Sequence, residues 1–297
     1  MKLAELGEDR VVAALTKALP VDERVLVAAG DDCAVVRTAG EILLLKTDCV
    51  MENVHFTRDA SPRAVGWKAL CRAISDTAAM GGRPGDALIT VALPPSLPLA
   101  WAQGLYAGLR RAATVYHVNL VGGETARSPS LIFVSVALTG SVPGGGYVTR
   151  AGGKPGDQLY VTGSLGGSIR GHHLTFRPRV EEALWLNEHL AVHAMMDLSD
   201  GLAKDLPRLA RASQTAYRLD VDRLPVNRGC TVEQALQDGE DYELLFAVAR
   251  EDAVALEAGW PKAFPRLTCV GELSAGRVRG ARRGGFDHFD PRIQSTP

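Results

Sequence analysis

At 297 residues, of which 46% are hydrophobic, the chain is long enough for two domains of ordinary size or one large domain. The net charge of -1 gives no bulk attraction to nucleic acid, and no apolar run approaches the roughly 20 residues that span a bilayer. The five cysteines are widely spaced and form no Cys-x-x-Cys pair. This spacing argues against a zinc site or a disulfide framework and predicts a cytoplasmic protein.

The first half of the chain predicts helices that alternate with strands. Helices are expected at residues 8–19, 62–80 and 97–114, and strands at 25–29, 42–45, 87–93, 117–121 and 131–138. In the second helix, Val65, Ala69 and Ile74 share one face, and Gly81 follows as a stop signal.

The run Pro143-Gly144-Gly145-Gly146 is the best boundary in the sequence, because it is short and has no periodicity. After it, strands are expected at 158–162, 194–196, 217–221, 242–248 and 267–271, and helices at 181–190, 202–212 and 253–258. We therefore predict two halves, residues 1–143 and residues 144–297. The order of elements lacks the strict rhythm of a doubly wound parallel sheet, so an α/β, α+β-like fold with mixed sheets is expected.

Several carboxylates occur at the ends of hydrophobic segments rather than on solvated helix faces. A buried carboxylate without a partner is costly, and few basic residues lie near these positions in the sequence. Oxygen ligands of this kind suit magnesium, which is usually held together with substrate phosphates. The pattern therefore predicts a metal and phosphate site. The acidic positions are Asp31, Asp32, Asp48, Asp76, Glu124, Asp197, Asp200, Glu240 and Asp241.

Each motif also has an ordinary structural interpretation. Gly30-Asp31-Asp32 fits a simple turn, and Ser199 or Asp200 fits a helix N-cap. The glycine-rich loop at residues 163–168 is either a phosphate-wrapping loop or a flexible connection, and His55 is either a substrate contact or a lone surface histidine. The joint occurrence of the acidic motifs favours the metal site.

Familiar nucleotide motifs are missing from the sequence. It contains neither a P-loop nor the protein-kinase signature set. Ser199 has no nucleophile-elbow context, which argues against a hydrolase triad.

Taken in order, the motifs resemble those of the thiamine-monophosphate kinase family, within the aminoimidazole ribonucleotide synthetase-like superfamily of ATP-binding proteins. The resemblance runs nearly end to end. It is carried by residues 30–34, 47–48, 53–56, 68–81, 120–125, 149–157, 160–163, 177–180, 197–202, 239–246 and 285–289.

The resemblance implies a two-domain fold. Residues 1–143 would form the domain that binds ATP and metal and that pairs two copies into a homodimer, and residues 144–297 would complete the cleft. It also implies phosphorylation of thiamine monophosphate to thiamine diphosphate by direct in-line transfer. ATP would be the co-substrate and several Mg²⁺ ions the cofactors, with no nucleic-acid or membrane partner.

The same resemblance assigns roles to individual residues. Those implied as metal ligands are Asp32, Thr47, Asp48, Asp76, Glu124, Asp197 and Asp200. Those implied as ATP contacts are Tyr116, Gly123, Glu124, Arg150 and Ser199. His55, Glu240 and Phe286 are implied as substrate contacts, and Asp48, Asp200 and Arg150 as the catalytic set.

Two positions depart from the usual family residues. Glu124 stands where aspartate is usual, and Lys46 stands where serine or threonine is usual. A lysine there would either replace the charge of one metal ion with a fixed cation or point into solvent. Two alternative functions follow: a relative that phosphorylates another small metabolite, and a catalytically weak nucleotide-binding paralogue. ATP turnover with and without thiamine monophosphate separates the three.

Overall fold

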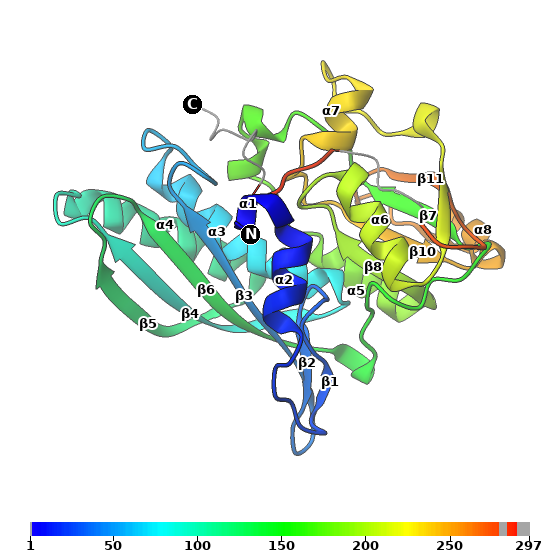
Figure 1. Cartoon of the computed structure of the whole chain (residues 1–297), viewed down its shortest axis with the longest axis horizontal. Helices are drawn as coiled ribbons and strands as arrows, with labels where there is room; N and C mark the ends of the chain where they lie inside the picture. Colours follow the sequence, from blue (N-terminus) through cyan, green and yellow to red (C-terminus); the bar gives the residue numbers. More distant parts are fainter. Residues whose placement is uncertain (1, 279–283, 290–297) are drawn as a thin grey trace.

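The computed structural model describes residues 2–278 and 284–289, so the last residues of the predicted second half lie outside the described part. One mixed sheet and one antiparallel sheet, both packed with helices, confirm the predicted α/β, α+β-like fold class (Figure 1). The first sheet has the order β1-β2-β3-β6-β4-β5, and its only parallel pair is β4 with β5. Its strands are β1 (Val25–Val27), β2 (Ala34–Arg37), β3 (Ile42–Met51), β4 (Arg83–Leu93), β5 (Asn119–Arg127) and β6 (Phe133–Ser141).

Two helices, α3 (Pro62–Ala79) and α4 (Leu99–Tyr116), pack together beside the first sheet. They approach closely because each contributes a glycine at the crossing. A Cβ atom on Gly66 would lie 2.0 Å from the carbonyl oxygen of Leu105, and one on Gly108 would lie 2.0 Å from that of Arg63. Almost all of α3 is buried, since the second half of the chain contacts it as well. The central position of α3 makes its few polar residues candidates for function.

The second half forms an antiparallel sheet of order β8-β10-β7-β11-β9. Its strands are β7 (Gln158–Thr162), β8 (Val192–Asp197), β9 (Ala216–Leu219), β10 (Leu244–Val248) and β11 (Leu267–Ser274). The helices of this half are α5 (Val180–His189), α6 (Leu202–Ala212), α7 (Val232–Gln237) and α8 (Ala253–Gly259). One hydrophobic core joins the two halves, because Ile74 and Val136 belong to the same buried cluster as Tyr160 and Phe246.

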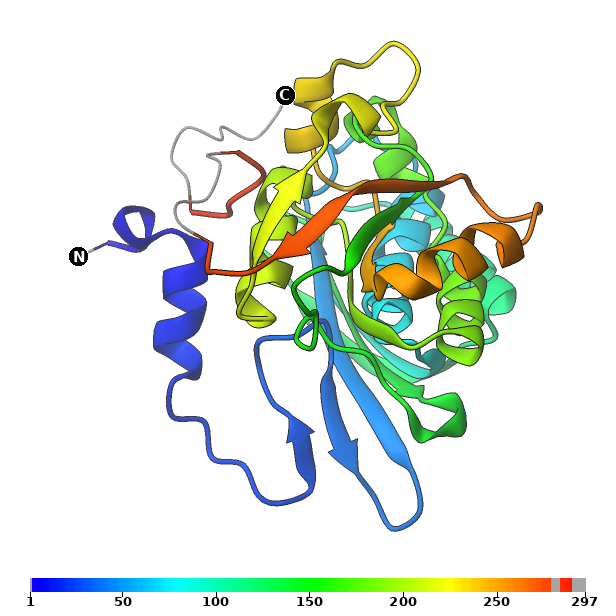
Figure 2. The ribbon, with the colours of Figure 1, turned by 90° about the vertical axis from the view of Figure 1, so that its right-hand side faces the viewer.

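The first two helices, α1 (Leu3–Leu6) and α2 (Glu8–Thr16), lie beside the second half although they precede the first sheet in sequence (Figure 2). Lys204 on α6 forms an ion pair with Glu8 at 2.8 Å, and Arg208 pairs with Asp9 at 2.7 Å. The first sheet ends at Ser141 and the second begins at Gln158, whereas the N-terminal helices contact α6 of the second half.

Among the strands that are longer than predicted, β3 and β5 change the setting of an acidic residue. β3 continues through Lys46, Thr47 and Asp48, which were expected at its end. Because alternate side chains of a strand point to opposite faces, Lys46 and Asp48 lie on the same face of β3. On that face they meet ionic partners on α3. β5 includes Gly123 and Glu124, which were expected in a turn. An edge strand tolerates glycine, because one side of its backbone remains unpaired.

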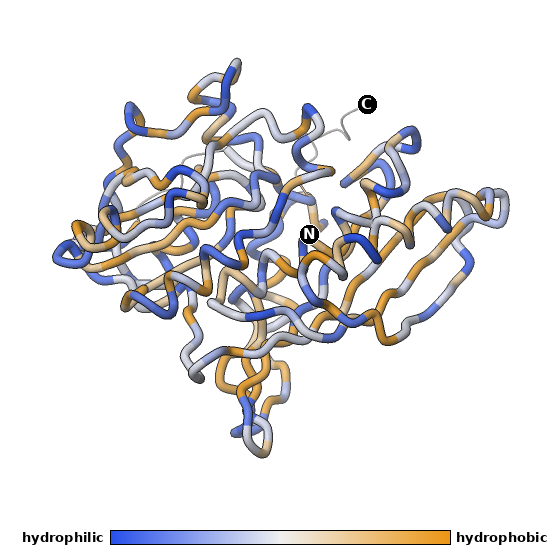
Figure 3. The backbone as a smooth tube through the Cα atoms, turned by 180° about the vertical axis from the view of Figure 1, so that it is seen from behind, coloured by the Kyte–Doolittle hydropathy of each residue, from blue (hydrophilic) through white to orange (hydrophobic). Residues whose placement is uncertain are grey.

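Hydrophobic colour follows the strands in the tube view, whereas hydrophilic colour gathers mainly in loops (Figure 3). Within the part of the chain that the structure describes, no helix combines the length and the apolar character needed to cross a membrane.

Candidate active site

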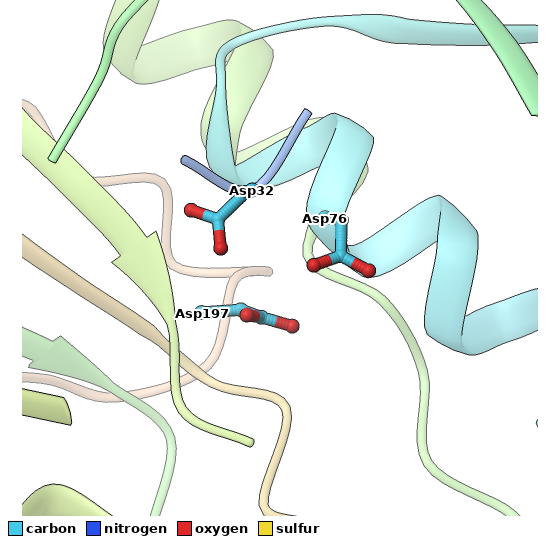
Figure 4. A group of neighbouring side chains, drawn as sticks. All are labelled: Asp32, Asp76 and Asp197. Carbon is cyan, nitrogen blue, oxygen red and sulfur yellow. The ribbon is translucent and has the colours of Figure 1, made fainter. Parts of the chain in front are cut away.

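Three carboxylates from distant segments meet at the junction of the two halves and form what we call the acidic cluster (Figure 4). Asp32 lies in the loop before β2, Asp76 on α3 and Asp197 at the end of β8. All three are buried, and one oxygen from each lies within 4.8 Å of the others. The Ser75 hydroxyl donates a hydrogen bond of 2.6 Å to Asp197. Asp76 is therefore not on a solvated helix face.

Fixed cations surround these carboxylates, although few basic residues are near them in the sequence. Arg150 donates to Asp32, and the Lys46 ammonium lies 2.9 Å from Oδ1 of Asp76. The backbone N–H of Arg150 also donates to Asp31, at 3.1 Å. Tertiary folding thus supplies part of the neutralising charge that the sequence analysis assigned to metal ions alone.

Asp48 lies beside the acidic cluster on the inner face of β3, two residues from Lys46. Its carboxylate accepts a 3.0 Å hydrogen bond from Arg72 of α3. Burial opposes ionisation of Asp48, but the charges of Arg72 and Lys46 lower its pKa below the usual aspartate value. Asp48 is therefore an ionised carboxylate with two cationic neighbours.

Full ionisation of the acidic cluster is unfavourable despite these partners. Burial and the charge of Asp32 raise the pKa of Asp197 to about 7. Burial also raises the pKa of Asp76, against the attraction of Lys46. Oδ2 of Asp32 is buried and has no hydrogen-bond partner among the described residues. Oxygen donors arranged in this way fit a hard divalent cation.

The acidic cluster, Asp48 and their basic partners are together called the charged region. A cavity of about 250 Å³ lies next to this region, and we call it the substrate cavity. It brings together all three residues implied as substrate contacts, His55, Glu240 and Phe286, with Ser199 and Asp200. The remaining lining residues are Val54, Arg72, Ile169, Asp238, Gly239, Tyr242 and His288. A mixture of apolar, aromatic and charged groups suits a small molecule with a ring and an ionic part.

Arg72 forms a wall shared by the charged region and the substrate cavity. Its guanidinium reaches Asp48 at 3.0 Å and Glu240 at 3.5 Å. The fully buried ammonium of Lys68 lies 2.6 Å from Glu240 and donates to the carbonyl oxygen of His55 at 2.7 Å. These two basic side chains of α3 fix Glu240 and the loop that carries His55.

His55 is neutral in this setting. Burial, together with the charges of Arg72 and Lys68, lowers the pKa of His55 to about 2. The backbone N–H of Met51 donates to Nδ1 of His55 at 3.0 Å, so the ring proton is on Nε2. A neutral imidazole with a fixed tautomer presents a hydrogen-bond donor and is not a surface histidine.

The turn at residues 197–201 is held by a residue that the sequence analysis missed. The backbone N–H groups of Ser199 and Asp200 donate to Asp205, at 3.1 and 2.9 Å. Helix α6 starts after Gly201 without a side-chain cap, so the N-cap interpretation of Ser199 and Asp200 is wrong. Asp200 pairs instead with Arg208 at 2.6 Å.

Several backbone N–H groups of the glycine-rich loop at residues 163–168 already have acceptors within the protein. The N–H of Gly166 donates to Asp241 at 3.0 Å, and that of Gly167 donates to Asp238 at 2.8 Å. The Ser168 hydroxyl donates to Asp241 at 2.5 Å. The loop is therefore anchored by carboxylates, which occupy the N–H groups of Gly166 and Gly167.

Four predicted site residues lie apart from the acidic cluster within one chain. Thr47 is exposed on the face of β3 opposite Asp48. Gly123 and Glu124 are exposed on the edge strand β5, which β6 and β4 separate from β3. Tyr116 ends α4 with its ring 6.0 Å from that of Trp67. The structure therefore does not bring these four residues to the acidic cluster.

The sequence analysis gave no role to Lys68 or Arg72, although their helical spacing could have identified them. Lys68, Arg72 and Asp76 recur every four residues, so they form one charged stripe along α3. The helix is otherwise largely apolar and buried, which makes such a stripe costly unless it has ionic partners.

Both halves of the chain match family models. Residues 30–142 match the model for the AIR synthase related protein, N-terminal domain, and residues 154–279 match its C-terminal domain. With the two sheets and the acidic cluster between them, these matches define a two-domain protein of the AIR synthase-related class.

Similar proteins narrow this class. The thiamine-monophosphate kinase of Rhodopirellula baltica is 36% identical over 262 residues, which cover 82% of this chain and 81% of the relative. That of Aquifex aeolicus is 35% identical over 279 residues, covering 84% and 89%. A solved structure described as "AaThiL complexed with AMPPCP and TMP" has 31% identity and a TM-score of 0.86, covering 97% and 99%. This chain belongs to the thiamine-monophosphate kinase family, which confirms the resemblance inferred from its motifs.

Proposed function

We propose that this protein transfers the γ-phosphoryl group of ATP to thiamine monophosphate, releasing ADP and thiamine diphosphate. The observation that carries the proposal is the shared wall of Arg72, which places the substrate cavity directly beside the carboxylates. Family membership supports the substrate, and the similar solved protein is described with AMPPCP and TMP.

The substrate cavity would hold the thiamine part of the acceptor. Phe286 would pack against an aromatic ring, and the Glu240 carboxylate would accept from a donor or face the thiazolium cation. The Nε2–H of His55 would donate to a polar atom of the acceptor. These contacts would direct the acceptor phosphate towards Asp48 and the acidic cluster.

The reaction would be an in-line exchange of one bond for another. An oxygen of the acceptor phosphate forms a bond to the γ-phosphorus, and the bond from this phosphorus to the β,γ-bridging oxygen breaks. The bridging oxygen leaves on ADP with the electron pair. The attacking phosphate is already ionised near neutral pH, so the residues need only position both groups and balance their charge. Arg150 would donate to a phosphate oxygen.

We further propose that the acidic cluster holds Mg²⁺ with the ATP phosphates. The unpartnered Oδ2 of buried Asp32 and the neighbouring oxygens of Asp76 and Asp197 fit this ion. When bound, Mg²⁺ would neutralise charge on the phosphate oxygens. Asp200 faces the substrate cavity and is paired with Arg208, so its predicted metal contact would require this ion pair to open.

Purified protein supplied with ATP and MgCl₂ tests the activity. We expect ADP release that depends on thiamine monophosphate, with thiamine diphosphate formed in equal amount and detected by chromatography. ATP turnover that ignores thiamine monophosphate but responds to another metabolite would contradict the proposed acceptor. ATP binding without any turnover would favour a catalytically weak paralogue.

We also propose a homodimer that pairs through the face of the first sheet opposite α3 and α4, here called the outer face. This face exposes Leu45, Leu88 and Val121, which line one groove at 41%, 49% and 59% exposure. Exposed apolar groups gathered in this way are typical of a protein interface. Thr47 and Glu124 are on or beside this face, so pairing would give them a second copy to contact.

Substitution Leu88→Glu tests the homodimer, because a charge in an apolar interface is costly. We expect monomers in sedimentation velocity, whereas Val254→Glu, at a 77% exposed position on α8, should leave the dimer intact. A dimer that persists in Leu88→Glu would exclude the outer face as the dimer interface.

We also propose a cytoplasmic location, which the five free cysteines support.

A further inference from the structure

A lysine ammonium lies among carboxylates whose arrangement otherwise fits divalent cations. Lys46 is on the inner face of β3, its side chain is 20% exposed, and its Nζ lies 2.9 Å from Oδ1 of Asp76. Asp48 shares this face two residues further along. The structure therefore resolves the two sequence alternatives for Lys46: the side chain points into the charged region and not into solvent.

Lys46 shares this region with two arginines, Arg72 and Arg150, among the described residues. Arg150 is held by Asp32 and Asp31, and Arg72 by Asp48 and Glu240, so each arginine joins the region to another segment. The one ion pair recorded for Lys46 among the described residues is with Asp76. Asp197 has a hydroxyl partner, Ser75.

The chemistry of lysine separates Lys46 from the two arginines. A guanidinium is planar and its donors are directed, whereas an ammonium is a compact point charge with three donors that rotate. It resembles a bound metal ion in charge distribution and in its preference for oxygen partners. An ammonium in contact with Asp76 also repels a divalent cation on the same side of that carboxylate.

We propose that Lys46 is a built-in cation that takes the place of one divalent ion between Asp48 and Asp76. The chain would consequently bind its nucleotide with one divalent ion fewer than it would with a neutral residue at position 46. The acidic cluster would keep its own ion through Asp32, Asp197 and the oxygen of Asp76 that Lys46 leaves free. This inference deepens the proposed kinase function and rests on it for the identity of the nucleotide.

The experiment counts bound Mn²⁺ per chain, using the non-hydrolysable analogue AMPPCP at saturation and electron paramagnetic resonance of the free ion. Lys46→Thr removes the charge and suits a strand. We expect this variant to bind one Mn²⁺ more than the native chain. Lys46→Arg keeps the charge and should bind the native number. Equal numbers in Lys46→Thr and the native chain would overturn the proposal.

Folding checks and a second variant ensure that the Mn²⁺ count can be interpreted. Circular dichroism and thermal unfolding establish that each variant is folded. Lys46→Gln, which is one atom shorter than lysine and carries no charge, replaces Lys46→Thr if that variant does not fold. The ion count needs no turnover. Failure of the native chain to form thiamine diphosphate would therefore reject the proposed function separately, whereas an unchanged ion count would reject only the role of Lys46.

Discussion

The acidic cluster and the substrate cavity lie side by side but are built from different kinds of structure. The charged region is carried mostly by regular elements: Asp48 on β3, Asp76 on α3 and Asp197 at the end of β8. The substrate cavity is lined mainly by loops, which include the segments of His55, Glu240 and Phe286. Rigid elements fix the carboxylates that would handle phosphate, whereas loops shape the surface that would recognise the acceptor.

Their electrostatics differ in the same way. Carboxylates in the acidic cluster repel one another, and this raises the pKa of Asp197 beyond the effect of burial alone. In the substrate cavity Glu240 is matched by Lys68 and Arg72. The first region is therefore strained without an added cation, whereas the second is already neutralised. Substitutions in the first should change catalysis and stability in opposite directions, and substitutions in the second should change acceptor binding.

The largest effect is expected from Asp197→Asn. This change keeps the shape and the hydrogen bond from Ser75 but removes a charge from the acidic cluster. We expect kcat to fall about a thousandfold, because stabilisation of the transferred phosphoryl group weakens. The thermal unfolding temperature should rise, since repulsion from Asp32 and Asp76 is relieved. Steady-state kinetics and scanning calorimetry measure the two effects.

The matched control is Asp59→Asn, which removes a carboxylate from an exposed loop and should alter neither kcat nor the unfolding temperature. A native kcat in Asp197→Asn would show that the cluster takes no part in catalysis. A lower unfolding temperature would show that Asp197 stabilises the fold despite its carboxylate neighbours.

The second effect is expected from Phe286→Ala in the substrate cavity. Loss of the ring removes apolar contact with the acceptor, so KM for thiamine monophosphate should rise about thirtyfold, equivalent to about 2 kcal/mol. The value of kcat should stay within about threefold, because the phosphoryl site is unchanged. Phe264→Ala, which removes a ring packed against Trp260, is the control and should leave KM unchanged. A fall in kcat at constant KM would show that Phe286 stabilises the transition state and does not contribute to binding of the acceptor.

The long periodic segments made much of the fold predictable. Helix α3 was expected within one residue of its observed end, because its apolar spacing and the glycine stop agree with each other. The end of β3 was predicted wrongly, because Lys46 and Asp48 looked too polar for a strand. Their ionic partners, Asp76 and Arg72, are far away in sequence, so only the fold reveals them.

Site residues that stand in a short sequence motif were predictable, whereas those that act through contacts between distant segments were not. Asp32, Asp76 and Asp197 each stand in a recognisable motif, and the structure brings them together. Lys68 stands in a motif but was given no role, and Asp205 stands in none. Their importance lies in tertiary contacts, of Lys68 with Glu240 and of Asp205 with the turn at residues 197–201. The positions of Thr47 and Glu124 on or near the outer face follow from strand register, which the sequence does not specify without its neighbours.

The smallest expected effect is on the pH dependence of folding stability, which tests whether His55 is neutral. The pKa of His55 is about 2 in the folded protein, against about 6.5 in the unfolded chain. Below pH 6.5 the unfolded chain therefore binds a proton that the folded protein does not, and folding stability falls as the pH decreases towards 2. For His55 alone, this loss is about 1 kcal/mol between pH 6.5 and pH 5.5.

His55→Asn removes the titrating group and keeps an acceptor for the N–H of Met51. The difference in unfolding free energy between the native chain and this variant should therefore change by about 1 kcal/mol from pH 6.5 to pH 5.5, in favour of the variant at the lower pH. Urea titrations at both pH values measure it. His117→Asn is the control, because His117 is exposed in the left-handed C-cap of α4, a conformation that asparagine tolerates. A difference that stays constant for His55→Asn would mean that His55 takes up its proton in the folded protein, so the acceptor would meet an imidazolium beside Arg72.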